Sequence, residues 1–170
     1  DSRYHFLNNA YTTNVICDVI ENICKLKTEI KWPNDILIYN KKISGIISEV
    51  FIKESLNLIN TGLGVNIISS PNLNDYETTN INQYNTINNI DFTYKLMEKY
   101  LKNIQLKINK PEIIMKNYKS RLKFLGKKIK LEQNNKNFQE GIFYDLSQDG
   151  SILFKQNSRI EKIYNARIIK

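Results

Sequence analysis

The residues with the clearest chemical meaning lie between Lys31 and Asn66. Three of the six glycines in the chain, Gly45, Gly62 and Gly64, interrupt runs that are otherwise rich in β-branched residues. Glycine weakens a strand interior unless a ligand or another backbone must come close. Because Gly62 and Gly64 are two residues apart, both open the same face of a strand. The spacing favours a flat ligand lying against a sheet, and a bulge or close strand packing is the structural alternative.

Two polar clusters accompany these glycines. Lys31-Trp32-Pro33-Asn34-Asp35 contains the only tryptophan of the chain and places an amide next to a carboxylate at a predicted turn. Asn34 and Asp35 could hold a metal, a ribose or an amine there, or could form an Asx turn with no ligand. Lys42 precedes Gly45 at the start of a predicted strand, where its ammonium could bind a carboxylate or a phosphate. The chain has many other lysines, so charge alone does not single out Lys42.

Hydrophobic periodicity predicts the elements that position these residues. Apolar residues at helical spacing predict a helix over 10–24. Alternating apolar residues then predict a meander of antiparallel strands over residues 29–32, 36–39, 43–52 and 56–68. Residues 69–89 are polar and are expected to form a surface loop with a short turn of helix. Two more helices are predicted, one over 91–108 with Asp91 as its N-cap and one from Pro111 onward.

After Gly126 the pattern returns to short strands. They are predicted over residues 128–132, 141–146, 151–155 and 160–168, with a hairpin turn at Gln148-Asp149-Gly150. Such closely spaced short strands are typical of a small barrel or sandwich. We therefore expect an α+β fold with two parts. Residues 1–124 would form a mainly antiparallel sheet with packed helices, and residues 125–170 a small β-domain.

The basic charge of the chain does not by itself indicate a nucleic-acid partner. The formal net charge is +8, yet only four of the 25 basic residues are arginines. The lysines accompany abundant Asn, Ile and Tyr, which is the residue usage of A/T-rich codons. A moderate positive field that attracts anions is therefore the favoured interpretation.

Several other classes are disfavoured by the sequence. No apolar run approaches the ~20 residues of a membrane helix, and no signal peptide is recognisable. Cys17 and Cys24 are the only cysteines and are expected to be buried, which predicts a cytoplasmic protein without disulfides. His5 is the only histidine, so a histidine-based metal site or nucleophile–histidine pair is not expected.

Three linked motifs resemble the catalytic core of biotin protein ligases. They are Lys31-Trp32-Pro33-Asn34-Asp35, then Lys42-Ile43-Ser44-Gly45-Ile46 followed by Glu49, and then Gly62-Leu63-Gly64-Val65-Asn66. That family has K-W-P-N-D, K-x-x-G-I with a following Glu, and G-x-G-x-N in the same order and at similar distances. The resemblance extends from about Asn14 to the C-terminus, where the chain resembles the SH3-like barrel that follows this core. The implied fold is that shared by class II aminoacyl-tRNA synthetases and biotin ligases.

The resemblance implies an enzyme that activates biotin with ATP as biotinyl-5′-AMP and transfers biotin to a lysine of a biotin carboxyl carrier domain. Lys42 would be catalytic and neutralise the biotin carboxylate and then the adenylate phosphate, while Asp35 and Asn34 would face Mg²⁺ or steer the carrier lysine. Asn66 would hold the adenosine half, because an amide both donates and accepts. The adenylate would lie against Lys42, Gly45, Ile46, Gly62, Gly64 and Trp32, the last as core or pocket wall. ATP, biotin and Mg²⁺, the last at Asp35, are the implied cofactors.

The sequence departs from the family in one respect. The family has a G-R-G-R-x-G-R biotin-binding loop upstream of its first core helix, and this sequence begins just before that helix. We therefore expect the 170 residues alone to bind biotin weakly, and to self-associate or fold poorly, until an upstream segment is supplied. A DNA-binding helix-turn-helix is also missing, so repressor activity is not expected, whereas a homodimer is compatible with the sequence.

Two other functions stay open at this point. A lipoyl or octanoyl transferase relative would share the fold, although K-W-P-N-D with K-x-x-G favours biotin. A basic module that binds RNA without catalysis would also explain the charge. ATP-dependent transfer of a label to a carrier protein distinguishes the enzymes from the module.

Overall fold

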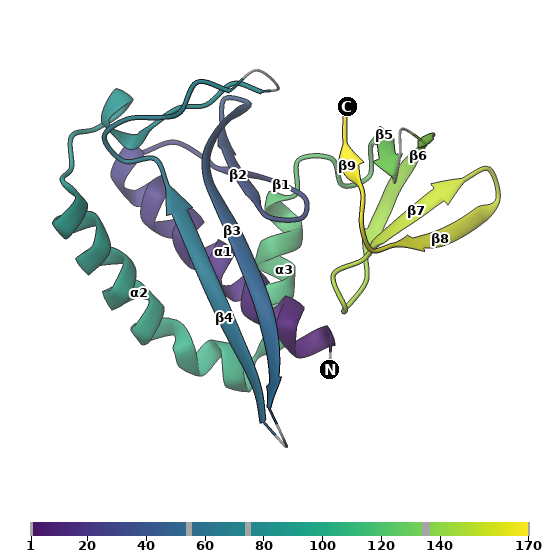
Figure 1. Ribbon diagram of the computed structural model, residues 1–170, viewed down its shortest axis with the longest axis horizontal. Coiled ribbons are helices and arrows are strands. Elements are labelled where there is room, and N and C mark those ends of the chain that lie inside the picture. Colours follow the sequence, from purple (N-terminus) through teal and green to yellow (C-terminus); the bar gives the residue numbers. More distant parts are fainter. Residues whose placement is uncertain (1, 54–55, 74–75, 134–136, 170) are drawn as a thin grey trace.

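The computed structural model of the chain describes residues 2–53, 56–73, 76–133 and 137–169. Its helices are α1 (Ser2–Cys24), α2 (Asn89–Asn109) and α3 (Pro111–Arg121), with a 3₁₀ turn η1 (Ile81–Gln83). Its strands are β1 (Glu29–Lys31), β2 (Asp35–Ile38), β3 (Lys41–Lys53), β4 (Leu56–Val65), β5 (Lys128–Gln133), β6 (Asn137–Leu146), β7 (Ile152–Gln156), β8 (Arg159–Ile163) and β9 (Arg167–Ile168). In Figure 1, α1 passes behind β3 and β4 with α2 and α3 on either side of it, and β5–β9 form a second sheet beside this part. This is the α+β architecture expected from the sequence.

The first sheet is an antiparallel meander in the order β1-β2-β3-β4, as the alternating pattern predicts. α1 packs against β3 on one side and against α2 and α3 on the other. Its apolar stripe is buried as its spacing predicts, and consists of Val15, Ile16, Val19, Ile20 and Ile23. The core of this part therefore lies between the helices and one face of the sheet, and the opposite face carries the candidate site.

α1 begins at Ser2, whereas the apolar pattern predicts a start at residue 10. The early part of its buried side mixes apolar residues such as Phe6 and Ala10 with polar ones, which conceals the helical period. Asn8 Nδ2 donates to Thr61 Oγ1 at 3.0 Å, and Asn9 Oδ1 accepts from a serine hydroxyl of β3 at 3.0 Å. Because β3 and β4 supply hydrogen-bond partners for these amides, the helix can pack them against the sheet beside its apolar residues.

The two later helices start close to their predicted positions. Asn88 caps α2 rather than Asp91, since Asn88 Oδ1 accepts from the Asp91 N–H at 2.8 Å. α3 begins at Pro111 as predicted, and η1 is the short helical turn expected within residues 69–89. As far as the structure describes them, none of the helices is long and apolar enough to cross a membrane.

The second sheet has five antiparallel strands in the order β8-β7-β6-β5-β9. The turn predicted at Gln148-Asp149-Gly150 joins β6 to β7. The stretch predicted as one strand over 160–168 forms β8 and β9 instead, and these lie at opposite edges of the sheet. Within the described residues β8 and β9 do not pair with each other. The sheet is therefore open, and the expected closed barrel is not confirmed.

One hydrophobic core extends across both sheets. Phe6 and Trp32 from the first part and Phe143 and Leu146 from the second belong to the same cluster of buried residues. Cys17 and Cys24 are also buried there and unpaired, as expected. Burial raises the pKa of the Cys17 thiol to about 12, so this cysteine is an inert core residue at neutral pH.

Candidate functional site

A β-bulge in β3 determines which side chains share the site. Asp35 pairs with Gly45, whereas Leu37 pairs with Lys42, so two steps along β2 correspond to three along β3. Ile43 is therefore the extra residue of the bulge. Residues three apart in a regular strand face opposite sides of the sheet. The bulge cancels this alternation and places Lys42 on the same face as Gly45 and Asp35.

Lys42 and Asp35 form an ion pair over Gly45. Lys42 Nζ lies 2.6 Å from Asp35 Oδ1, and the two side chains are 24% and 25% exposed. A Cβ at position 45 would come within 3.1 Å of Lys42 Cε, so glycine leaves room for the lysine. Burial acts to lower the pKa of Lys42, but the hydrogen bond and the charge of Asp35, together with Tyr76, outweigh it and raise the pKa. The ammonium is therefore charged at neutral pH, and Tyr76 Oη lies 3.5 Å from it, a contact that no sequence pattern indicated.

Gly62 and Gly64 extend this face onto β4, as their spacing of two residues in a strand predicts. Gly64 pairs with Gly45 and Gly62 pairs with Ile47, and both glycines of β4 are exposed. A Cβ at position 62 or 64 would meet a backbone oxygen at 3.8 Å, which is an ordinary contact. The fold therefore accepts a side chain at both positions. A ligand that lies on the face explains the two glycines better than packing does.

Asn34 and Asn66 secure the two ends of this face. Asn34 Nδ2 donates to the Ile46 carbonyl, and the Ile46 N–H donates back to the Asn34 carbonyl at 3.2 Å. Asn66 Nδ2 donates to the carbonyls of Thr79 at 3.0 Å and Lys42 at 3.4 Å. Asn66 uses both of its amide N–H groups in these bonds, so Oδ1 is the atom that it can offer to a ligand, whereas Asn34 has one further N–H as well as Oδ1. Asn66 also fixes the loop that contains Thr79 to the start of β3.

Two predicted binding residues lie away from this face. Ile46 follows Gly45 in β3, so its side chain points to the opposite face and is only 1% exposed. The prediction that Ile46 contacts the ligand is corrected for this reason. Trp32 is 4% exposed, and its Nε1 donates to the Gly150 carbonyl at 2.8 Å. Trp32 is therefore a core residue, which is one of the two roles that the sequence allowed.

Ile47 is a site residue that the motifs did not identify. It pairs with Gly62 on the glycine face and is 69% exposed. An exposed isoleucine beside a glycine floor provides an apolar wall for a ligand. The alternation from Gly45 contained the signal, because it places residue 47 rather than residue 46 on the same face.

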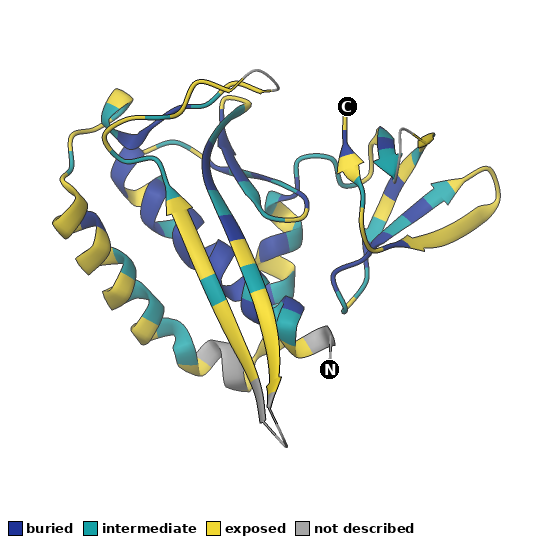
Figure 2. Ribbon diagram, viewed as in Figure 1, coloured by how far each residue is buried: buried dark blue, intermediate teal, exposed yellow. Residues whose placement is uncertain are grey.

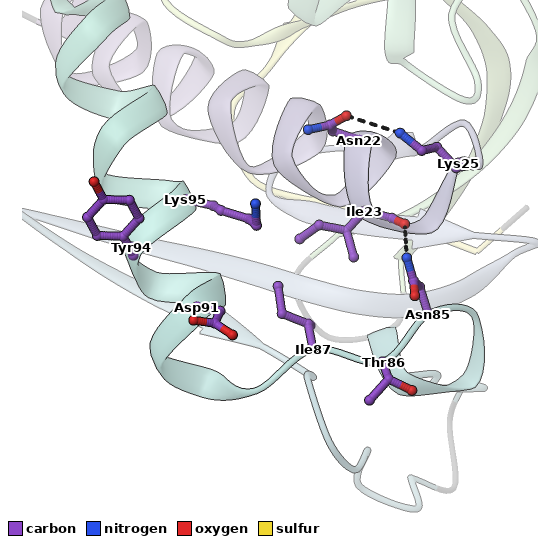
Figure 3. A pocket seen from close by; sticks show the side chains of 9 residues that line it. All are labelled: Asn22, Ile23, Lys25, Asn85, Thr86, Ile87, Asp91, Tyr94 and Lys95. Atoms are coloured by element: carbon purple, nitrogen blue, oxygen red, sulfur yellow. Dashed lines mark hydrogen bonds between the residues drawn. The ribbon is translucent and has the colours of Figure 1, made fainter.

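The cavity beside the ion pair is too small for a complete ligand site. Its volume is about 100 Å³, and its lining includes Asp35, Lys42 and Tyr76. Small-molecule sites usually have volumes of roughly 300–1,000 Å³. A larger cavity of about 590 Å³ lies elsewhere, where side chains of α1, α2 and the segment between η1 and α2 converge (Figure 3). None of the predicted site residues lines that second cavity.

Much of the β3–β4 hairpin is exposed to solvent (Figure 2). Its exposed apolar residues lie on both faces of the two strands, with Ile47, Phe51 and Leu58 on the glycine face and Val50, Ile52, Ile59 and Leu63 on the opposite face. β4 is also the last strand of its sheet, so its outer side has no strand partner among the described residues. An apolar surface beside an unpaired strand edge is typical of a face that another segment or protein covers.

Part of the chain resembles a known family in sequence. Residues 5–66 match the Biotin/lipoate A/B protein ligase family. Over 54 residues the chain is 43% identical to the bifunctional ligase/repressor BirA of Bacillus subtilis (strain 168). That match covers 31% of this chain and 17% of the curated relative, so the shared segment is a small part of that protein.

Solved biotin protein ligases have the same fold. The apo enzyme from Aquifex aeolicus matches with a TM-score of 0.77 and 20% identity, over 96% of this chain and 73% of that one. The Aquifex aeolicus enzyme in complex with biotin and ATP matches with a TM-score of 0.75 and 20% identity, over 96% of this chain and 70% of that one. The Leishmania major enzyme in complex with biotinyl-5-AMP matches with a TM-score of 0.58 and 19% identity, over 92% of this chain and 70% of that one.

Residues 5–66 of this chain therefore match the Biotin/lipoate A/B protein ligase family, and the fold of the chain is that of the solved biotin protein ligases. All three linked motifs lie within the matched residues, and together with these similarities they support a biotin protein ligase.

Proposed function

We propose that the protein attaches biotin to a lysine of a biotin carboxyl carrier domain, using ATP and passing through biotinyl-5′-AMP. The glycine face carries this proposal. Gly45, Gly62 and Gly64 form a floor without side chains, next to the charged ammonium of Lys42. A ligand with a compact ring system and an anionic group fits such a floor, because the ring can approach the backbone while the anion binds the lysine. Biotin and its adenylate both have these features.

Lys42 has a defined role in each of two proposed steps. In the first step, a carboxylate oxygen of biotin forms a bond to the α-phosphorus of ATP, and pyrophosphate leaves. In the second step, the carrier lysine amine attacks the acyl carbon and loses a proton, and AMP leaves. Both steps concentrate negative charge between the acyl and phosphoryl groups, where a fixed ammonium stabilises it most. The ion pair with Asp35 holds Lys42 at the edge of the glycine floor for this purpose.

We assign the remaining polar residues from their positions around Lys42. Asn66, at the end of β4, would hold the adenosine half through Oδ1, because its amide nitrogen is bonded to backbone carbonyls. Asn34 and Asp35 would face the phosphate end or the incoming carrier lysine, because Asp35 already contacts the ammonium of Lys42. Ile47 replaces Ile46 as the apolar residue that we assign to the ligand wall.

We assign any Mg²⁺ that accompanies ATP to Asp35. Within the described residues, no group of three or more His, Cys, Asp or Glu side chains could enclose a metal ion. Mg²⁺ that binds together with substrate phosphates usually takes only one or two carboxylates from the protein, so Asp35 alone fits this role. When bound, the ion would offset the negative charge of the phosphates. The chain itself contributes a carboxylate that Lys42 keeps in place.

We further propose that residues 1–124 form the ligase part and residues 125–170 an SH3-like domain. The second sheet supports this division, because it starts at Lys128 and consists of short antiparallel strands. The carrier partner is an acidic domain in this proposal, since the chain has a net charge of +8.

The proposed function is tested by biotin-dependent exchange of pyrophosphate into ATP and by transfer of labelled biotin to a carrier protein. We expect both activities in an extended form, in which the biotin-loop segment of a biotin protein ligase precedes residue 1. Exchange that requires lipoate or octanoate in place of biotin would identify a different substrate. Salt-sensitive retention of RNA without any exchange would contradict an enzymatic role.

Replacing Gly62 by alanine is expected to weaken biotin binding by about tenfold without destabilising the fold. The new methyl group fits the backbone but lifts the ligand from the floor, and one misplaced methyl group costs roughly tenfold or more in a close-fitting site. Gly141→Ala is the matched control, because its Cβ would lie 2.5 Å from Phe154 Cζ. Calorimetry with biotin and thermal unfolding of the extended form measure both effects. A loss of Tm in Gly62→Ala as large as in Gly141→Ala would show that Gly62 is structural.

A further inference from the structure

The segment that leads to Asn34 and Asp35 is held by two buried hydrogen bonds. Trp32 Nε1 donates to the Gly150 carbonyl at 2.8 Å. Tyr118 Oη donates to the Pro33 carbonyl at 2.6 Å. Trp32 and Tyr118 are 4% and 0% exposed, so water competes little for either bond. The acceptor of the first bond lies in the β6–β7 turn, whereas the donor of the second comes from α3.

Phe6 connects these two bonds into a closed ring of contacts. Its side chain packs edge-on against Tyr118, with ring centroids 5.4 Å apart and an interplanar angle of 85°. Its other neighbour is Gly150, where a Cβ would lie 2.1 Å from the Phe6 ring and where φ is +85°. Glycine is required there by both the close approach and the backbone conformation. The contacts run from Trp32 through Gly150, Phe6 and Tyr118 to Pro33, and they enclose the start of β2.

The β6–β7 turn is itself firmly held. Asp149 Oδ1 accepts from the Ser151 N–H at 3.1 Å and from its hydroxyl at 2.6 Å, while Oδ2 accepts from Lys162 Nζ at 3.0 Å. Burial acts to raise the pKa of Asp149, but these hydrogen bonds outweigh it and keep the pKa well below its usual value. The carboxylate is therefore charged at all moderate pH values. The turn consequently offers Trp32 an acceptor in a fixed position.

We propose that the β6–β7 turn positions the candidate site by holding the start of β2 through the Trp32–Gly150 hydrogen bond. Asp35 lies three residues after Trp32 and pairs with Lys42 at 2.6 Å, so a displacement of Trp32 moves the carboxylate away from the ammonium. A misplacement of about 1 Å is enough to slow a positioned reaction strongly. Gly150 and Tyr118 are positioning residues in this proposal, because they act through Trp32 and Pro33. The effect of this positioning on catalysis rests on the proposed function, whereas the structural part of the proposal does not.

The structural part is tested by hydrogen exchange of the indole N–H. Trp32 is the only tryptophan of the 170 residues, so its indole signal in a ¹H–¹⁵N spectrum of the extended form is assigned by its loss in Trp32→Phe. Tyr118→Phe removes the hydrogen bond to the Pro33 carbonyl from this ring of contacts. The substitution is expected to accelerate exchange of the indole N–H by about tenfold. Tyr11→Phe is the matched control, because Tyr11 Oη also donates to a backbone carbonyl, that of Tyr100, but joins α1 to α2. We expect this control to change the rate by less than about twofold.

The catalytic part is tested in the extended form with Trp32→Phe and Tyr118→Phe. Each variant is expected to lower kcat for biotin-dependent pyrophosphate exchange by about tenfold, with KM for biotin changed less than threefold. Because a smaller folded fraction would also lower the apparent kcat at unchanged KM, kcat is expressed per folded enzyme, with the folded fraction of each variant measured by circular dichroism. Tyr11→Phe should keep both constants within about twofold of the parent.

The two measurements separate the possible outcomes. Equal acceleration of indole exchange in Tyr118→Phe and Tyr11→Phe would mean that the indole opens only by global unfolding, and would overturn the proposal. A normal kcat in both Trp32→Phe and Tyr118→Phe would overturn the catalytic part of the proposal. An extended parent that shows no biotin-dependent exchange would contradict the proposed function, and indole exchange would then decide the positioning role alone.

Discussion

Lys42→Ala in the extended form is expected to reduce biotinyl-adenylate formation by about 10²–10³-fold. The ammonium is the fixed positive charge at the edge of the glycine floor, and its pKa is raised by the hydrogen bond with Asp35. Removing one preorganised donor from the place where charge develops costs about 2.7–4 kcal/mol of transition-state stabilisation. Lys42→Arg keeps the charge on a larger, planar group, so we expect it to recover only part of the activity.

Lys41→Ala is the matched control for this prediction. Lys41 is the neighbouring residue in β3, but its Nζ pairs with Glu77 at 3.2 Å, and both partners are largely exposed. Exposed ion pairs contribute little, typically about 0–1 kcal/mol. We therefore expect Lys41→Ala to keep pyrophosphate exchange within about twofold of the parent. Similar activity in the two alanine variants would show that Lys42 has no special role.

The second large effect concerns the chain without an upstream segment. We expect the 170 residues alone to bind biotin weakly or not at all, and the extended form to bind it at least 100-fold more tightly (about 2.7 kcal/mol). The cavity at Asp35 and Lys42 is only about 100 Å³, and the glycine floor lies open beside it. In a site exposed to water, each ionic contact falls to ~1 kcal/mol or less.

Calorimetry with biotin on both forms measures this difference. A sub-micromolar dissociation constant for the 170-residue chain would show that the site is complete without an added segment. The exposed hairpin gives an independent measurement, because its apolar residues and the edge of β4 should make the shorter form self-associate. Sedimentation should show that the extended form associates less, since an added strand covers the same surface.

The local sequence was sufficient where a regular period or a turn signal determined the structure. The parity of Gly62 and Gly64 predicted their shared face, and the strand pairing confirms it. The apolar stripe of α1, the start of α3 at Pro111 and the β6–β7 turn at Asp149 and Gly150 were also predicted, because each depends on residues close together in the chain.

The remaining features depend on contacts between distant residues. The apolar pattern in the first turns of α1 is interrupted by asparagines, whose hydrogen-bond partners lie in β3 and β4. Tyr76 reaches Lys42 from a loop more than 30 residues away, at 3.5 Å, and no local pattern predicts such a contact. The role of Trp32 was ambiguous for the same reason. Its hydrogen-bond partner is Gly150, which lies 118 residues further along the chain.

The bulge at Ile43 is what allows Lys42 and Gly45, an odd number of residues apart, to share one face of β3. A regular strand with the same separation would turn the ammonium toward the side of the sheet that α1 covers, whereas removing one residue together with the bulge would keep it on the glycine face. An odd separation between two residues that must share one face of a strand implies an extra residue between them. In relatives of unknown structure, the number of residues from this lysine to this glycine therefore indicates whether the strand contains a bulge. A homologue with an even interval would need either an unbulged strand or a different cation to carry out the same chemistry.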